Sequence, residues 1–505
     1  MILEGEVSRL ILNLAIIGSN MGEAGMGANP VSRKPMLVRD TSWLTVSEII
    51  SVLLALIGQV ILTRAILQSE YGMWILLIDI FTAIFLIVDA GLPTLISRDG
   101  ANNPFVLRKA VRKVWKLQLM VAVPFVLIGL PTVILRNNSP SELIYLAAII
   151  SLLHIASYAP RSALRAAGEA RLEAVSKVVE RTVITVGYAF LLLIKNDSVF
   201  SYGLVFSIGS AVGFLSCVLL MHKFVPKNED KLESLGGSWT STKSLVISAL
   251  PFAMTLGILP YITRIEKFFL SGISLEFVAI FHVGQLAWMA GMIVPISISS
   301  ALLPILGEHR LNRSRFLTEV DNSLKPIKIL LVLGLVAGSV FVSLVLPFAF
   351  PEEYTLDGNN LNSVDVFIYL LTGWGFSLLA APWNTAIKAG RNSWTYTLYV
   401  TLIVLLGTAG AWIFIPRYGL MGAVISANLT CFFMLFLGLL MSKDIGRVTQ
   451  GYQKYSWILM LLLCLIFPIA WYIAKWVAIT LAIMIGAKLQ IIDRLTVSEL
   501  LDSEE

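Results

Sequence analysis

Apolar runs close to twenty residues long recur along the chain from residue 43 to the late 480s, and short polar segments separate them. A helix needs about 20 mostly apolar residues to cross a bilayer. No interval between the runs could hold a soluble domain of ordinary size. The pattern predicts an all-α integral membrane protein, with helices at residues 43–63, 72–95, 117–135, 142–160, 178–194, 199–221, 245–270, 276–304, 326–350, 364–387, 394–416, 419–441, 457–473 and 476–488.

The end of the chain leaves the helix count open between 13 and 14. Between Trp457 and Ala487 only Lys475 interrupts the apolar run. One long tilted helix or two shorter ones would fit this stretch.

Composition agrees with a membrane protein and excludes several other classes. Charged residues make up 14% of the chain, against roughly 25% in an ordinary soluble protein. The net charge of +6 is not gathered into a basic, aromatic-rich face, so no nucleic acid is expected as a partner. Cys217, Cys431 and Cys464 all lie in apolar runs without metal-ligand spacing. We therefore expect no metal, no cofactor and no disulfide framework.

Lysine and arginine residues are distributed unequally between alternate loops. If the N-terminus is inside, the inner segments carry 29 of these residues and the outer segments carry 5. Cytoplasmic loops carry such an excess in multi-pass proteins. The count predicts a cytoplasmic N-terminus in a plasma-membrane protein.

The chain divides into five segments on this reading. Residues 1–41 form an N-terminal extension that we expect to be disordered; they make a poor signal peptide, and translation could start at Met21 or Met36. The N-lobe (42–221) holds helices 1–6, a cytoplasmic linker (222–244) follows, and the C-lobe (245–441) holds helices 7–12. Residues 442–505 would form the C-terminal helices and an acidic tail.

A weak internal repeat relates the two lobes. Glu70-Tyr71, between helices 1 and 2, matches Glu276-Phe277, between helices 7 and 8, at an offset of 206 residues. A six-helix unit repeated in the same orientation is typical of a two-lobed transporter whose substrate binds between the lobes.

Four stretches resemble the polysaccharide-biosynthesis or oligosaccharide flippases of the multidrug/oligosaccharidyl-lipid/polysaccharide exporter superfamily. They are residues 61–99, 161–182, 262–306 and 386–430, the last with "IPRYGLMGAVISA". The sequence departs from the family in two places. The turn after Arg64 reads Ala-Ile-Leu-Gln where an aromatic-Leu-Gly is frequent, and Glu266 stands where an aspartate is common.

The resemblance implies a MATE-like fold of two six-helix lobes plus one or two C-terminal helices. It also implies a flippase that moves a polyprenyl- or dolichyl-(di)phosphate-linked oligosaccharide by alternating access. Its partners would be that lipid-linked oligosaccharide, membrane lipids and a glycan polymerase or glycosyltransferases, and we expect a monomer. Two alternatives stay open: a cation-coupled multidrug or small-molecule exporter of the same fold, and a membrane glycosyltransferase. The chain has no P-loop, no HExxH motif and no Ser-His-Asp arrangement, so we expect no enzyme activity.

Three charges within "LPYITRIEKFFLSG" (259–272) are the main candidate site. A charge deep in a bilayer costs roughly 2.5 to 3.5 kcal/mol and usually faces a cavity or a partner. Arg264 and Lys267, three residues apart, share a helix face, whereas Glu266 points away from them. We expect Arg264 and Lys267 to hold the carrier phosphate. The alternative is a structural ion pair, with Asp79 at similar depth as the partner.

The remaining candidates lie nearer the helix ends. Arg64 and Arg98 match family positions for substrate binding, but an interface anchor fits them equally well. Coupling or gating is assigned to Asp79, Glu266, Glu48 and Asp89. Arg161 and Arg165, at the inner end of helix 4, could attract the incoming carrier phosphate, although ordinary positive-inside residues look the same.

Overall fold

The computed structural model describes residues 36–100, 103–124, 126, 140–226, 232–309, 312–356, 361–390, 393–442 and 451–502. Ten helices in this part of the chain are long and apolar enough to cross a membrane. Every regular element in these ranges is helical, as the sequence predicts. Most of the predicted extension (1–41) lies outside the described residues, and α2 begins at Met36.

The first half of the chain forms α2 to α9. The first helices are α2 (Met36–Ala65), α3 (Gln68–Asp89), α4 (Leu92–Asp99) and α5 (Leu107–Pro124). They are followed by α7 (Ser141–Ala166), α8 (Ala170–Leu193) and α9 (Val199–Phe224). Two short 3-10 turns, η4 (Leu232–Leu235) and η5 (Gly237–Trp239), lie in the linker.

The second half forms α10 to α20. It begins with α10 (Thr242–Ile258), η6 (Leu259–Thr263), α11 (Ile265–Leu270), α12 (Leu275–Gly291) and α13 (Ile293–Glu308). The later helices are α14 (Arg313–Ala349), α15 (Glu352–Thr355), α16 (Ser363–Lys388), α17 (Ser393–Ser442), α19 (Gly451–Ile473) and α20 (Lys475–Asp502).

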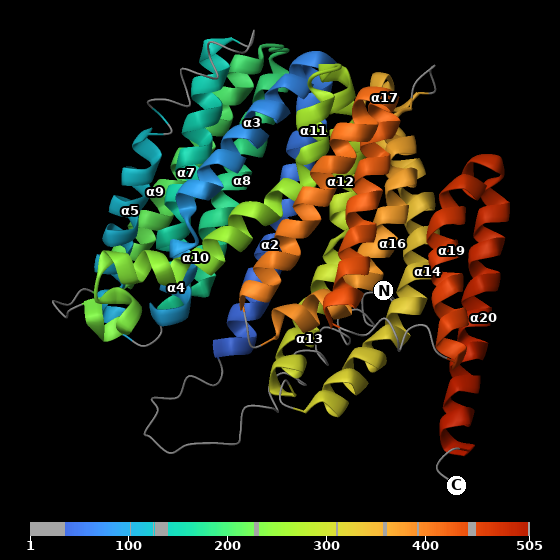
Figure 1. The fold of residues 1–505 in the computed structure, drawn as a ribbon. Helices are drawn as coiled ribbons and strands as arrows, with labels where there is room; N and C mark the ends of the chain where they lie inside the picture. Colours follow the sequence, from blue (N-terminus) through green and yellow to red (C-terminus); the bar gives the residue numbers. More distant parts are fainter. Residues whose placement is uncertain are drawn as a thin grey trace.

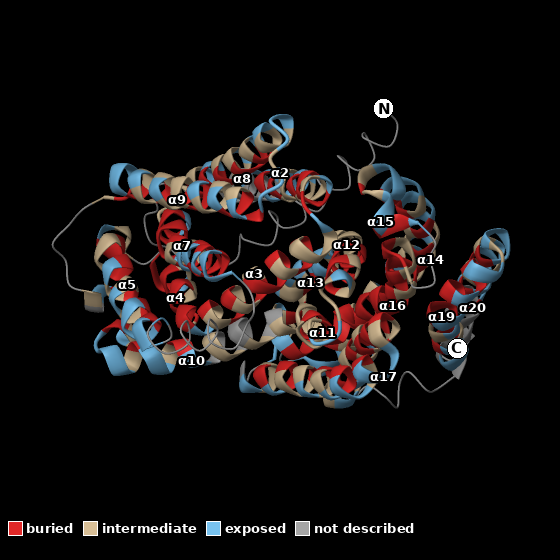
Figure 2. Cartoon of the chain, turned by 90° about the horizontal axis from the view of Figure 1, so that it is seen from above, coloured by how far each residue is buried: buried red, intermediate tan, exposed pale blue. Residues whose placement is uncertain are grey.

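The two halves of the chain form two groups of helices that meet along α3 and α12 (Figures 1 and 2). We call the end of the bundle where α2 ends, at the top of Figure 1, the upper end, and the opposite end the lower end. Helix α16 packs against α12, α13, α14 and α17 and is buried over most of its length. It is therefore the central helix of the second group, and α19 and α20 lie outside it (Figure 2).

Several helices are longer than the hydropathy pattern predicts. Helix α5 begins ten residues before the predicted residue 117, α8 begins at Ala170 rather than 178, and α14 begins at Arg313 rather than 326. These extra turns carry charges on one side and buried apolar residues on the other, such as Val111 and Phe316. A hydropathy threshold ends a helix at the first charges, whereas an amphipathic helix continues past them.

The predicted single helix 245–270 is wrong, because the chain breaks in its middle. Helix α10 ends at Ile258, a 3-10 turn follows, and Arg264 has non-helical angles (φ −121°, ψ −21°) before α11 begins. Pro260 opens the 3-10 turn, where its missing N–H and fixed φ are tolerated. The break therefore occupies residues 259–264.

The predicted helix 276–304 is divided at Met292 into α12 and α13, whereas two later breaks agree with the predicted boundaries. The continuous range of α17 includes Gly419 at φ 54° and ψ −125°, which separates two helices there. Only glycine adopts such angles readily. Helices α19 and α20 meet at Ala474, so the end of the chain forms two helices rather than one.

Candidate functional site

The site assembles where the break in the α10–α11 segment faces α3. Arg264 Nε donates to Asp79 Oδ1 at 3.0 Å, and Lys267 Nζ forms an ion pair with Asp79 Oδ2. The ion pair of Arg264 with Asp79, which was the alternative to a phosphate site, is present, and the two cations share a face as expected. The sequence did not predict that Lys267 binds the same carboxylate. One anion on α3 thus joins two cations on the other group of helices.

This cluster is deep and largely enclosed. Asp79 is eleven residues beyond the start of α3, which places it roughly 16 Å along the helix from the upper end. Its side chain is 13% exposed, that of Lys267 is 4% exposed and that of Arg264 is 18% exposed. His282 of α12 completes the cluster, with its Nδ1 3.3 Å from Lys267 Nζ. Arg264 is the cation that keeps the most access to its surroundings.

Glu266 lies on the other side of α11 and is fully buried. Neither of its carboxylate oxygens has a hydrogen-bond partner among the described residues. Helix α11 packs against α17 on this side, where the Ser426 side chain is a polar neighbour of the carboxylate. Glu266 is separate from the two cations, as predicted, but it makes no salt bridge of its own in the described structure.

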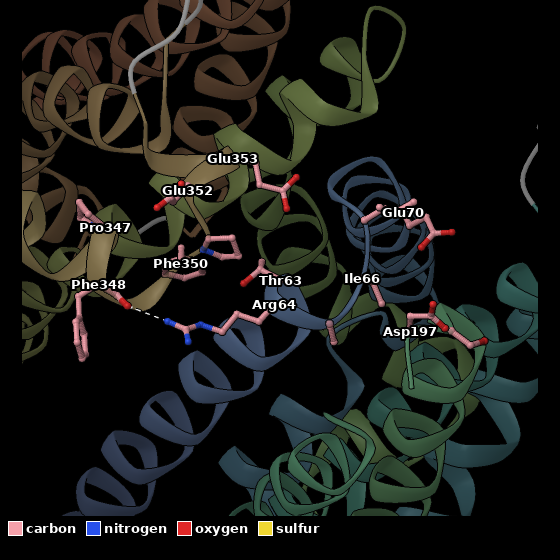
Figure 3. Close-up of a pocket in the computed structure, with 14 residues that line it drawn as sticks. Thr63, Arg64, Ile66, Glu70, Asp197, Pro347, Phe348, Phe350, Glu352 and Glu353 are labelled. Carbon is pink, nitrogen blue, oxygen red and sulfur yellow. Dashed lines mark hydrogen bonds between the residues drawn. The ribbon is translucent and has the colours of Figure 1, made fainter. Parts of the chain in front are cut away.

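Arg64 lies at the upper end and joins the two groups of helices there. Its Nη2 donates to the Phe348 carbonyl at 2.9 Å (Figure 3), and its Nε donates to the Ala349 carbonyl at 3.0 Å. A cation is favourable at the C-terminal end of α14, where backbone carbonyls lack helical partners. Gln68 Nε2 makes a similar contact to the Glu353 carbonyl at 3.1 Å.

Arg98 is at the lower end and does not join Arg264 and Lys267. It forms a bidentate ion pair with Asp99, at 2.6 and 3.0 Å. Trp239 Nε1 donates to the same carboxylate at 2.9 Å and Ser238 Oγ at 3.1 Å. Burial acts to raise the pKa of Asp99, but these donors, Arg98 first, outweigh it and hold the pKa below its ordinary value. Asp99 thereby attaches the linker to α4.

Arg161 and Arg165 are engaged in ion pairs between α7 and α8. Arg161 Nη2 lies 2.6 Å from Glu180 Oε2, and His154 Nε2 lies 2.5 Å from Oε1 of the same residue. Arg165 binds Glu173 through two contacts of 2.5 and 2.8 Å. The Arg161 side chain is 8% exposed and that of Arg165 is 48% exposed. Of the two, only Arg165 lies where an approaching anion could reach it.

The other two acidic candidates differ in environment. Glu48 is 63% exposed and contacts Lys177 Nζ at 3.3 Å. This is an ordinary surface ion pair. Asp89, the last residue of α3, is buried and accepts a hydrogen bond from Gln118 Nε2 at 3.1 Å. In the part of the chain that the structure describes, no group of His, Cys, Asp and Glu residues could hold a metal ion.

A broken helix, buried charges at mid-depth and two facing groups of helices define a multi-pass membrane protein with the architecture of a two-lobed transporter. The chain belongs to a known family of this class: the family described as polysaccharide biosynthesis protein matches residues 37–309. No curated protein matches the sequence.

Solved structures share the fold at low sequence identity. A lipid II flippase, MurJ, in an inward closed conformation superposes with a TM-score of 0.63 at 15% identity, over 91% of this chain and 99% of that one. An outward-facing multidrug resistance MATE family transporter of the MOP superfamily gives 0.55 at 15% identity, over 82% and 96%. A MOP superfamily transporter from Pyrococcus furiosus gives 0.56 at 16% identity, over 83% and 97%. The chain therefore has the MATE-like fold.

Proposed function

We propose that this protein is a flippase that translocates a polyprenyl- or dolichyl-(di)phosphate-linked oligosaccharide across the plasma membrane by alternating access. The observation that carries the proposal is the pair of cations, Arg264 and Lys267, held at mid-depth where the two lobes meet. Membership of the polysaccharide biosynthesis family supports the substrate class.

In the proposed mechanism Asp79 occupies the position that the carrier phosphate takes during transport. A phosphate brings more negative charge than one carboxylate, and guanidinium binds it bidentately. When the phosphate displaces Asp79, the link between α11 and α3 is released. Since the ion pair joins α3 of one lobe to the α10–α11 segment of the other, its exchange would couple substrate binding to a change in how the lobes meet.

Glu266 and Asp89 are the proposed coupling residues, because both are buried carboxylates away from the substrate cations. Glu266 is the stronger candidate, since its oxygens have no protein donor in the described structure. Glu48 is the weakest, given its exposure. Arg165 and Arg98 would attract the anionic carrier at the lower end, whereas Arg64 would act at the upper end as an anchor between the lobes rather than as a ligand of the carrier.

The excess of Lys and Arg in alternate loops supports a cytoplasmic N-terminus, with the lower end inside. We propose that the protein acts as a monomer and delivers its glycan to a polymerase or a glycosyltransferase.

The test is deletion of the gene in its host, followed by lipid extraction. Deletion is expected to make the lipid-linked oligosaccharide accumulate, and the wild-type gene to reverse this. Arg264→Ala should fail to reverse it at normal protein level, whereas Arg417→Ala, which alters an exposed arginine, should succeed. An unchanged lipid-linked pool together with increased drug sensitivity would instead identify an exporter.

A further inference from the structure

A narrow apolar slot lies between α2, α12, α14 and α16, away from the Asp79 cluster. Its volume is about 380 Å³, near the lower end of the range for ligand pockets. Its lining along α14 extends from Gly334 to Ala349, which corresponds to roughly 22 Å of helix. The slot is therefore long enough to hold an extended hydrocarbon chain along α14.

Gly338 lines the slot, and the absence of a side chain at this position leaves space in it. A Cβ atom on Gly338 would make only ordinary contacts, 3.7 Å from the side chains of Leu371 and Phe367. Beside the slot, Phe341 is 64% exposed and Phe348 is 84% exposed, so this side of α14 faces the membrane. Because water is absent at this depth of a bilayer, lipid hydrocarbon is the available occupant.

One polar group lines the slot without a partner. Trp288 is 6% exposed, and its indole N–H has no acceptor among the described residues. A double bond in a bound chain would give this N–H a weak acceptor.

A polar pocket of about 830 Å³ lies next to the upper end of the slot (Figure 3). Phe350 lines both spaces. Along α2, Val60 lines the slot, and Thr63 and Arg64, one turn further, line the polar pocket. An apolar space beside a polar one matches an amphipathic ligand with a single direction of insertion.

The polar pocket is negatively charged. Four carboxylates line it, those of Glu70, Asp197, Glu352 and Glu353. Arg64 is the one basic residue in its lining, and its guanidinium already donates to the carbonyls of Phe348 and Ala349. The pocket therefore complements a cationic group and disfavours an anionic diphosphate.

We propose that α2 and α14 hold a membrane lipid with an amine-bearing headgroup. One hydrocarbon chain of the lipid lies in the slot, and its ammonium group faces Glu352 and Glu353 in the polar pocket. This is a lipid site separate from the translocated substrate. Its position beneath the Arg64 contacts makes it a stabiliser of the closed upper end.

The test measures lipid retained by the purified full chain after reconstitution into vesicles of phosphatidylethanolamine mixed with phosphatidylglycerol. Native mass spectrometry or lipid extraction after detergent washing is expected to show roughly tenfold preferential retention of phosphatidylethanolamine. Gly338→Leu, which fills the slot, should abolish retention, whereas Gly307→Leu, where a Cβ meets nothing within 4 Å, should preserve it. Val345→Trp is a second slot variant at a more exposed position.

The headgroup is tested separately with Glu352→Gln/Glu353→Gln. This pair is expected to remove the preference for the amine lipid, while Glu142→Gln/Glu276→Gln, at exposed carboxylates outside the pocket, should keep it. Equal or stronger retention of phosphatidylglycerol, or of an added polyprenyl phosphate, would overturn the proposal. Retention that survives both Gly338→Leu and Val345→Trp would also overturn it.

Discussion

Gly72 of α3 lies directly against the carbonyl oxygen of Leu275 at the start of α12, so close that a Cβ atom on Gly72 would overlap that oxygen. Small residues allow helix backbones to approach in this way inside membranes. The contact joins the two lobes near the upper end, close to where Arg64 binds the end of α14. A backbone oxygen cannot rotate aside as a flexible side chain can.

Gly72→Ala is therefore expected to force α3 and α12 apart and to destabilise the protein by roughly 1–3 kcal/mol, the usual effect of overpacking. Thermal unfolding in detergent measures this as a lower midpoint. Gly307→Ala is the control, because its new Cβ meets nothing within 4 Å and alanine favours a helix. Equal midpoints for the two variants would show that the close contact is absent in solution.

Much of the fold follows from the hydrophobic pattern, because a bilayer allows few solutions for an apolar run of twenty residues. The hydrophobic pattern misplaced helix ends where charged side chains form ion pairs with each other inside the protein. Arg165 and Glu173 pair across the short turn between α7 and α8, so a segment predicted as a polar loop is mostly helix. The break before Arg264 has a signal in the sequence, because Pro260 is unfavourable in the interior of a continuous helix.

The candidate site was predictable in part. Helical spacing placed Arg264 and Lys267 on one face, and Asp79 was expected at a similar depth. The contacts of Arg64 with the end of α14 could not be predicted, since its partners are backbone carbonyls nearly 300 residues away. Every residue has a backbone carbonyl, so the residue types do not indicate which carbonyls will accept hydrogen bonds from Arg64.

Asp79 and Lys267 should show strong energetic coupling. Asp79→Ala leaves Arg264 and Lys267 facing each other without a neutralising anion, which is expected to lower the unfolding midpoint substantially. Adding Lys267→Met removes one of the unpaired charges and should restore part of the loss. A double-mutant cycle by thermal unfolding is expected to give a coupling energy of about 1 kcal/mol or more.

Glu48→Ala combined with Lys267→Met serves as the control cycle, because Glu48 contacts Lys177 and not Lys267. Its effects should add. If the Asp79 cycle is also additive, Lys267 does not share the carboxylate with Arg264.

Glu266 is expected to oppose stability while supporting transport. A buried carboxylate without donors is costly, so Glu266→Met should raise the free energy of unfolding by about 1–3 kcal/mol. The same change should reduce export of the lipid-linked glycan if Glu266 couples transport. Thermal unfolding and the size of the lipid-linked pool test the two effects.

Glu180→Met is the matched comparison, because Glu180 is equally buried but is bound by Arg161 and His154. Removing it leaves the Arg161 charge unpaired and should lower stability by roughly 3–5 kcal/mol. A Glu266→Met protein that is destabilised to the same extent would mean that Glu266 has donors in the membrane.

Asp99 should make the attachment of the linker dependent on pH. The pKa of Asp99 is lowered in the folded state, so its contribution to stability is fully present above the unfolded value of about 3.9 and is lost as the pH falls through the folded value. At pH 7, Asp99→Asn is expected to lower the free energy of unfolding by roughly 1–2 kcal/mol. The loss should be nearer the smaller value, because Arg98 is half-exposed and solvent weakens its ion pair. As the pH falls below about 3.9, the difference in unfolding midpoint between the wild type and the variant should shrink, because Asp99 then becomes protonated in the folded protein as well. A difference that stays constant over the whole acid titration would show that the charge of Asp99 does not hold Arg98 and Trp239.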